Sequence, residues 1–230
     1  MTQAHITIDI VTLFPKLFIG PLNESMVKQA QKRGAVKIQT HDLRDFAPDK
    51  RRTCDDKPFG GGPGMVMTVQ PIDDCLKQID GGWRILVSPR GKAFEHETAR
   101  RLARKRHLIF ICGHYEGIDE RVHDHLVNEE ISIGDFVTTG GEFPALCMID
   151  AVIRWVPGVL GNEDSLSSES FSNGSLDFPQ YTKPRNFDGW KVPEVLFSGD
   201  HRAIGKWRAD QALKLTKKHR PDLLILKKER

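Results

Sequence analysis

The chain has 230 residues, enough for one large domain or two smaller ones that each bury a hydrophobic core. Charged residues make up 28% of it, the net charge is +3, and no apolar run reaches the roughly 20 residues of a membrane span, so we expect no membrane protein. The four cysteines form no Cys-x-x-Cys pair, no His stands at ligand spacing, and no secretory signal is visible, which predicts reduced, mostly buried thiols, no metal site and a cytoplasmic location.

The N-terminal region has the pattern of a βαβ unit. His5 to Val11 alternates and is rich in β-branched residues, which predicts a strand, and Val36 to His41 predicts a second one. Between them we expect one helix that begins after Pro15 and ends near Gly34. Two strands joined by such a helix pair in parallel, so the predicted fold class is α/β with a parallel sheet.

A long loop is expected from Asp45 to Val69, with a glycine-rich centre at Phe59 to Met67. This centre lacks the Gly-Lys-Ser/Thr ending and does not open a helix directly after a strand, so a phosphate-binding loop is rejected. Loops of this length are typically functional lids or flexible segments. The apolar run Met65 to Met67 favours a lid that packs down on the protein, and a flexible surface loop is the alternative.

The middle of the chain alternates between helical and strand patterns. Helices are expected at Val69 to Ile79 and Glu95 to Arg106, and apolar strands at Arg84 to Val87 and Leu108 to Cys112. Each of these strands ends in a turn that contains glycine or proline.

The stretch from Glu130 to Glu142 is broken twice by glycine. It predicts a short strand that stops at Gly134, a second strand segment at Phe136–Val137 and a further break at Gly140–Gly141, before a helix that reaches Val156. Glycine permits the backbone to approach a ligand closely, which is one interpretation of two breaks around one strand. An ordinary strand with a bulge is the other.

Three predicted strands therefore end in glycine- or proline-bearing turns. In a parallel sheet these ends lie at one edge, which is where α/β sheets bind ligands. No Gly-x-Gly-x-x-Gly fingerprint is present, which argues against a nicotinamide-dependent enzyme and against the common Rossmann methyltransferases. The pattern predicts a nucleotide-like ligand held by loop amides and carbonyls.

The C-terminal part of the chain differs in composition. Asn162 to Gly174 is polar, Ser-rich and acidic, which predicts a linker that need not be ordered by itself. Prolines keep Leu176 to Pro184 extended, and Asp200 to His219 predicts a basic helix capped by Ser198 or Asp200. We expect one domain at residues 1–160, a linker at 161–175 and a small helical domain at 176–230.

Positive charge is concentrated in this last region. From residue 176 onward, 13 Lys and Arg stand against 7 Asp and Glu. Such an excess is typical of a module that meets a polyanion, and a solvated lysine-rich helix is the alternative.

Six motifs, in order along nearly the whole chain, resemble those of the bacterial tRNA (guanine-N1) methyltransferases. That family belongs to the trefoil-knotted SPOUT methyltransferase superfamily and acts on the guanosine 3′ of the anticodon, at tRNA position 37. The motifs are Asp9 to Pro15, Asp56 to Met67, Gly113 to Val122, Ile131 to Val137, Gly140 to Glu142 and Pro193 to Gly199.

The resemblance implies a more detailed architecture than the residues alone predict. It implies a deep trefoil knot at the C-terminal end of the α/β domain and a helical C-terminal domain that binds tRNA. It also implies a homodimer with an active site shared across the interface, S-adenosylmethionine as methyl donor, and a magnesium requirement at a site that the sequence does not place.

The resemblance places the methyl donor against the three predicted strand ends. The family usually has Tyr at the position of Phe136 and an aliphatic residue at that of Thr138, so backbone contacts are expected to matter most there. The implied cofactor-binding residues are Val87, Ser88, Pro89, Gly113, Tyr115, Glu116, Gly117, Ile133, Gly134, Asp135, Phe136, Val137, Thr138, Gly140, Gly141 and Pro144.

Methylation of guanine N1 requires a base for the N1 proton and a cation for the charge that develops on O6. The resemblance implies Glu169 as the base and Arg154 as the cation, and Phe171, Asp177, Arg202 and Lys206 as tRNA contacts. Most relatives carry Asp at the position of Glu169, so Asp177 is an alternative base. A tRNA-binding protein of the same fold with impaired catalysis is the alternative function.

Overall fold

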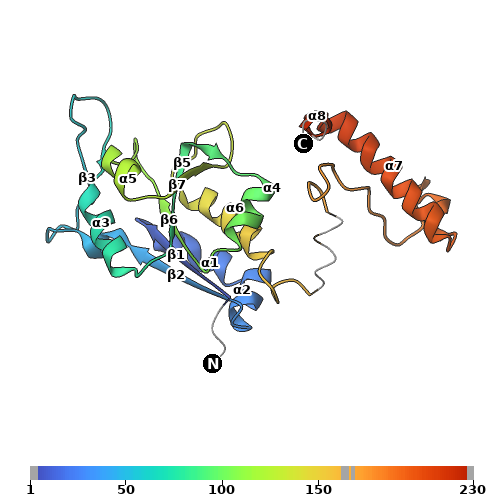
Figure 1. Cartoon of the computed structure of the whole chain (residues 1–230), viewed down its shortest axis with the longest axis horizontal. Coiled ribbons are helices and arrows are strands. Elements are labelled where there is room, and N and C mark those ends of the chain that lie inside the picture. Colours follow the sequence, from blue (N-terminus) through green and yellow to red (C-terminus); the bar gives the residue numbers. More distant parts are fainter. Residues whose placement is uncertain (1–4, 162–165, 167–168, 227–230) are drawn as a thin grey trace. The chain divides into compact units, whose positions relative to one another are not determined.

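The computed structural model describes residues 5–161, 166 and 169–226. The chain divides into two compact units, Met1–Gly161 and Asn162–Arg230, which are drawn in blue to yellow and in orange to red in Figure 1.

A single parallel sheet organises the first unit. Its strands lie side by side in the order β2-β1-β6-β5-β7, and every neighbouring pair is parallel. The predicted α/β class with a parallel sheet is therefore confirmed. The strands are β1 (Ile6–Thr12), β2 (Val36–Asp42), β5 (Trp83–Ala93), β6 (His107–Cys112) and β7 (Glu129–Ser132).

Helices cover both faces of this sheet, as Figure 1 shows. On one face Ile8, Ile10 and Phe110 pack beneath α1 (Ile19–Leu22), α2 (Ser25–Lys32), α4 (His96–Leu102) and α6 (Glu142–Ile153). On the other face Val11 and Ile109 pack beneath α3 (Val69–Gln78) and α5 (Glu120–His125). Leu108 to Cys112 of β6 are fully buried, which is why this strand reads as a continuous apolar run.

Two helix predictions need correction. The single helix expected between Pro15 and Gly34 is broken into the 3₁₀ helix η1 (Pro15–Phe18), α1 and α2, because the chain turns after α1 and Ser25 adopts a positive φ of 50°. Helix α4 ends at Leu102, so the basic residues 104–106 lie in the turn that leads into β6.

The long glycine-rich loop is partly ordered as a ribbon. After the 3₁₀ helix η2 (Leu43–Phe46), the antiparallel strands β3 (Asp55–Asp56) and β4 (Val66–Met67) pair with each other. Met67 is fully buried and its amide donates to the carbonyl of Gly117, whereas Phe59 at the tip is fully exposed. The apolar end of the loop packs down as predicted, and the tip does not.

The second unit is built on one long helix. Asp200 caps α7 (His201–His219) by accepting hydrogen bonds from the amides of Arg202 and Ala203, which confirms one of the two predicted caps. Smaller elements surround this helix: β8 (Asn186–Phe187), β9 (Trp190–Lys191), the 3₁₀ helix η4 (Glu194–Phe197) and α8 (Asp222–Leu226).

The cysteines are free thiols, and three of the four are buried, as predicted. Burial raises the pKa of Cys75 to about 12, so this thiol stays protonated near neutral pH. Cys147 on α6 is exposed. In the part of the chain that the structure describes, the helices are all too short or too polar to cross a membrane.

A buried carboxylate joins three strands of the sheet. Asp9 of β1 is 4% exposed, and its two oxygens lie 2.5 Å from His41 Nε2 on β2 and 2.6 Å from His107 Nε2 on β6. Burial alone raises the pKa of Asp9, but the hydrogen bonds and charges of the two histidines outweigh that effect and hold the pKa below its ordinary value of 3.8.

We expect Asp9→Asn to lower the free energy of unfolding by roughly 3 kcal/mol at pH 7, because it removes a charged partner from two histidines. Because the pKa of Asp9 is lower in the folded state than in the unfolded state, its ionised carboxylate stabilises the fold above about pH 4. This contribution is lost as the pH falls through the folded-state pKa. Urea unfolding at pH 7 and pH 3 measures both effects. The gap between the two proteins should narrow in acid, and a gap that stays constant would contradict the assignment.

Candidate active site

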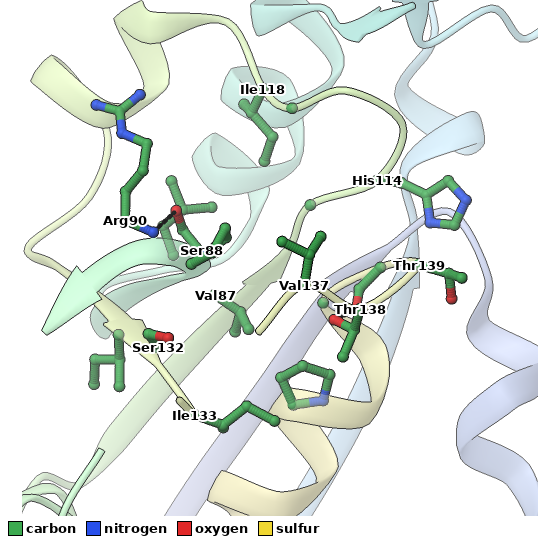
Figure 2. Close-up of a pocket in the computed structure, with 18 of the residues that line it drawn as sticks. Val87, Ser88, Arg90, His114, Ile118, Ser132, Ile133, Val137, Thr138 and Thr139 are labelled. Atoms are coloured by element: carbon green, nitrogen blue, oxygen red, sulfur yellow. Dashed lines mark hydrogen bonds between the residues drawn. The ribbon is translucent and has the colours of Figure 1, made fainter. Parts of the chain in front are cut away.

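A cavity of about 240 Å³ lies at the carboxyl edge of the sheet. Its walls are residues 86–90 in the middle of β5, the turn after β6 and the long loop between β7 and α6. These strands are neighbours in the order β6-β5-β7, so the three predicted segments do meet at one edge of the sheet. The predicted end of the strand at Val87 was wrong, because β5 pairs with β7 as far as Ala93 after a register shift between Val87 and Lys92. Figure 2 shows Val87, Ile133 and Val137 from two of these segments arranged around the same space.

Most of the expected cofactor-binding residues line this cavity. The exceptions are Gly134 and Asp135, which shape the loop after β7 without lining the space. Sequence reasoning missed several lining residues, among them Ile118 and Ser132, which adjoin the predicted turns, and His123 on α5, for which no sequence signal was available. The complete set of missed residues is Leu86, Arg90, His114, Ile118, His123, Ile131, Ser132 and Thr139.

Gly141 lies in close backbone contact with the turn after β6. Its amide donates to the carbonyl of Gly113 at 2.8 Å, and a Cβ at this position would lie 2.9 Å from both Cys112 Cα and Gly113 N. A bridge between His114 and Gly140 adds a second backbone link. The backbone does approach closely here, and its partner is the turn after β6, so the two loops form one continuous wall.

The expected strand segment at Phe136–Val137 is absent. Phe136 donates its amide to the carbonyl of Gly134 in a tight turn, and Gly134 has a φ of 152°. Phe136 is 57% exposed and Val137 is 83% exposed. The prediction of a strand here was wrong because the turn leaves the segment without a neighbouring strand to pair with.

The charges that line the cavity are few. Glu116 is the one carboxylate among the lining residues, and Gly64 of the glycine-rich loop lies against its side chain. Arg90 forms two 2.7 Å hydrogen bonds with Glu120 on α5, and Figure 2 shows it directed away from the centre of the cavity. The lining therefore suits a ligand that is neutral or carries positive charge better than it suits a pyrophosphate.

A buried polar pair stabilises the wall of the cavity that the two interlocked loops form. Glu142, at the start of α6, is 2% exposed and accepts a 2.8 Å hydrogen bond from Thr12 Oγ1 at the end of β1. Its other oxygen lies 3.9 Å from His114 Nδ1. These contacts link β1, the turn after β6 and the start of α6, and so fix the base of the loop that carries Gly140 and Gly141.

The two expected catalytic residues belong to different units. Arg154 directly follows α6 in the first unit and is half-buried. Glu169 and Asp177 belong to the second unit, where Ser170 Oγ donates to Asp177 Oδ1 at 2.8 Å and Ser172 Oγ donates to the carbonyl of Glu169 at 2.7 Å.

The segment that carries Glu169 is a turn packed on α7. Phe171, with a φ of 77°, donates its amide to the carbonyl of Ser175, and the amide of Leu176 donates to the fully buried Thr216 Oγ1 of α7. Part of the expected linker is thus folded onto the C-terminal unit, whereas residues 162–165, 167 and 168 lie outside the described residues. The expected tRNA contacts Arg202 and Lys206 are exposed in the first turns of α7.

The parallel sheet, the wall of interlocked loops and the cavity at the carboxyl edge define an α/β protein of the ligand-binding type, with a site made mainly of backbone. Comparison with known proteins specifies the class. Residues 6–226 match the family model described as tRNA (Guanine-1)-methyltransferase TrmD, and the chain belongs to this family of methyltransferases.

Curated relatives agree with the family model over nearly their whole length. A tRNA (guanine-N(1)-)-methyltransferase of Geobacter sulfurreducens is 53% identical over 220 residues, which cover 94% of this chain and 90% of the relative. Proteins of the same name from Carboxydothermus hydrogenoformans and Anoxybacillus flavithermus are 54% and 53% identical, each over 94% of this chain, and over 87% and 91% of their own lengths.

Proposed function

We propose that this protein transfers the methyl group of S-adenosylmethionine to N1 of the guanosine at position 37 of tRNA. The observation that carries the proposal is the cavity built from the middle of β5 and the loops after β6 and β7, in a chain that belongs to the tRNA (guanine-N1) methyltransferase family. The basic C-terminal unit supports tRNA as the substrate.

The cavity suits S-adenosylmethionine. Apolar side chains such as Ile118, Ile133 and Pro144 offer contact to the adenine ring, and the glycine-bearing turns offer backbone amides and carbonyls for polar groups. Glu116 is the one acidic lining residue, which is compatible with a positively charged sulfonium. When bound, S-adenosylmethionine supplies an electrophilic methyl group.

Two side chains carry the chemistry in this proposal. The carboxylate of Glu169 accepts the N1 proton of guanine, which leaves an electron pair on N1 for the new bond to carbon. The guanidinium of Arg154 stabilises the negative charge that spreads to O6. Asp177 is the alternative base, since it lies in the same folded turn as Glu169.

The proposal includes a trefoil-knotted domain and a homodimer in which one subunit supplies Glu169 to the site of the other. The interlocked turns after β6 and β7 are where the family's knot is expected. Helix α6 is predominantly apolar, and Phe143 on it is 56% exposed, which supports a protein partner for its uncovered side. We also propose a cytoplasmic location, where tRNA is available.

The decisive test measures methyl transfer from labelled S-adenosylmethionine to tRNA transcripts. We expect labelling of a transcript with guanosine at position 37 and at least a 100-fold lower rate when adenosine replaces it, because adenine N1 carries no proton for the base to remove. Equal labelling of the two transcripts would refute the proposed target.

A second candidate is a tRNA-binding protein with impaired catalysis, and the feature in its favour is Glu169, at a position where the family resemblance implies Asp. The extra methylene moves the carboxylate by about 1 Å, which can cost on the order of 100-fold in rate. If this candidate is right, the protein binds both S-adenosylmethionine and tRNA, and no methyl group is transferred.

A magnesium requirement stays a prediction. Among the described residues no group of three or more His, Cys, Asp and Glu side chains is arranged to hold a metal ion. Titration of activity with a chelator and then with magnesium chloride tests the requirement directly.

We expect Gly141→Ala to weaken S-adenosylmethionine binding at least tenfold. The added methyl would meet the backbone of Cys112 and Gly113 at 2.9 Å, and backbone cannot move aside without displacing the wall of the cavity. Calorimetric titration measures the affinity. Gly20→Ala is the matched control in the same unit, because a Cβ there has nothing within 4 Å and should leave the affinity unchanged. Equal affinities in both variants would exclude this role for Gly141.

A further inference from the structure

A second cavity, of about 390 Å³, lies within the C-terminal unit. The extended segment 178–185, the 3₁₀ helix η4 and the first half of α7 enclose it. Its volume falls in the range of small-ligand sites, about 300–1,000 Å³. Every lining residue comes from one unit, and none of them belongs to the cavity at the edge of the sheet or has a part in the proposed methyl transfer.

The lining combines aromatic rings with positive charge. No Asp or Glu is among the lining residues. The Arg185 guanidinium lies 4.2 Å from the centroid of the Phe197 ring, and that of Arg208 lies 4.7 Å from the Phe178 centroid. We call the aromatic and basic part of this lining the aromatic cradle. It consists of the rings of Phe178, Tyr181, Phe197 and Trp207 and the cations Lys183, Arg185 and Arg208.

The aromatic residues of the cradle are not fully buried. Tyr181 is 49% exposed and Phe197 is 44% exposed, so each keeps free surface. The centroids of Tyr181 and Trp207 lie 6.3 Å apart at an interplanar angle of 52°, so these two rings are tilted and do not stack face to face. Proteins hold unpaired nucleotides by combining open aromatic surface with arginine, because each nucleotide has a base face that can stack and a phosphate that can pair with a cation.

Charge selects among the possible occupants. An apolar protein segment would bury three cations without a counter-charge, which is costly. An acidic peptide would pair with the cations and offer no planar group to the exposed ring of Tyr181. An RNA nucleotide satisfies both, and α7 also presents the exposed cations Arg202 and Lys206 for neighbouring phosphates.

We propose that the aromatic cradle binds one unpaired nucleotide of the RNA substrate, with its base on the rings and its phosphate on Arg185 and Arg208. The inference rests on the proposed tRNA substrate and adds a contact made by residues other than Glu169, Asp177 and Arg154. It assigns Tyr181, Trp207 and Arg208 to substrate affinity and gives them no part in the methyl-transfer step.

The test measures the affinity of the full-length protein for a tRNA transcript by filter binding. Removal of one stacking ring typically costs about 1–3 kcal/mol, so Tyr181→Ala should bind about 5- to 100-fold more weakly. Tyr181→Phe keeps the ring and should bind like the unchanged protein. Trp190→Ala removes an aromatic side chain that is 76% exposed and outside the cradle, and it should also bind normally.

Two further readouts separate substrate contact from a loss of folding. S-adenosylmethionine affinity should be unchanged in Tyr181→Ala, and the rate at saturating tRNA should be retained while KM rises. For Arg208→Gln, the slope of log K against log salt should fall in magnitude by about 1, because one phosphate contact is lost. A merely structural role for Arg208 would not change this slope.

The outcomes distinguish this inference from the proposed function. If the unchanged protein methylates tRNA and Tyr181→Ala binds it equally well, the cradle is no nucleotide site and the function stands. If Tyr181→Ala alters the subunit association in sedimentation without a change in tRNA affinity, the cradle is a protein contact and the inference fails. If the unchanged protein neither binds nor methylates tRNA, both fail.

Discussion

The Glu169→Gln variant is expected to lose about 10²- to 10⁴-fold in turnover, with little change in its affinity for S-adenosylmethionine or tRNA. An amide has nearly the shape of the carboxylate but cannot accept the N1 proton of guanine, so the loss isolates general-base catalysis. Single-turnover methylation with saturating tRNA measures the effect, because it separates the chemical step from product release.

Two further variants locate the base. Glu169→Asp introduces the residue that the family resemblance implies at this position and should retain activity, since a carboxylate remains in the same turn. Asp177→Asn should keep most of its activity if Glu169 is the base. Should Asp177→Asn abolish transfer while Glu169→Gln retains it, the assignment of the two carboxylates is reversed.

The Arg154→Ala variant is expected to lose about 10²- to 10³-fold in turnover while S-adenosylmethionine affinity stays nearly intact. A cation placed where negative charge develops acts mainly on the transition state, and removal of one such donor typically costs a factor of this size. Calorimetric titration together with rates at saturating tRNA separates the two effects.

Arg154 also follows α6 directly, so its replacement could affect the fold. Arg154→Lys keeps the charge without the planar guanidinium and should recover part of the rate. Thermal unfolding of all three proteins is the control. A large loss of S-adenosylmethionine affinity in Arg154→Ala, accompanied by a lower melting temperature, would assign the residue a structural role instead.

Much of the fold could be predicted from local pattern. The apolar run of Leu108 to Cys112 identified β6, alternation identified β1, and the Asp200 cap marked the start of α7. These features depend on residues a few positions apart, which a single sequence displays directly. The single helix expected between Pro15 and Gly34 was wrong, because the chain turns after α1 and Ser25 adopts a positive φ, which apolar spacing does not reveal.

Part of the candidate site could also be predicted from local pattern, and part could not. Local pattern predicted three apolar strands followed by glycine- or proline-bearing segments, and a parallel sheet brings these segments to one edge. It did not predict that β5 continues past Val87 to Ala93, because that extension depends on pairing with β7. The sequence by itself determined the family, through motifs that lie in order along the chain.

Only the tertiary structure decided which of these features contact one another. It placed Gly141 against Cys112 and Gly113, paired Arg90 with Glu120, and joined Asp9 to His41 and His107. It likewise gathered the aromatic cradle from residues spread between positions 178 and 208. The physical reason is that close packing and charge neutralisation depend on partners far apart in the chain, and no local periodicity records which residues those partners are.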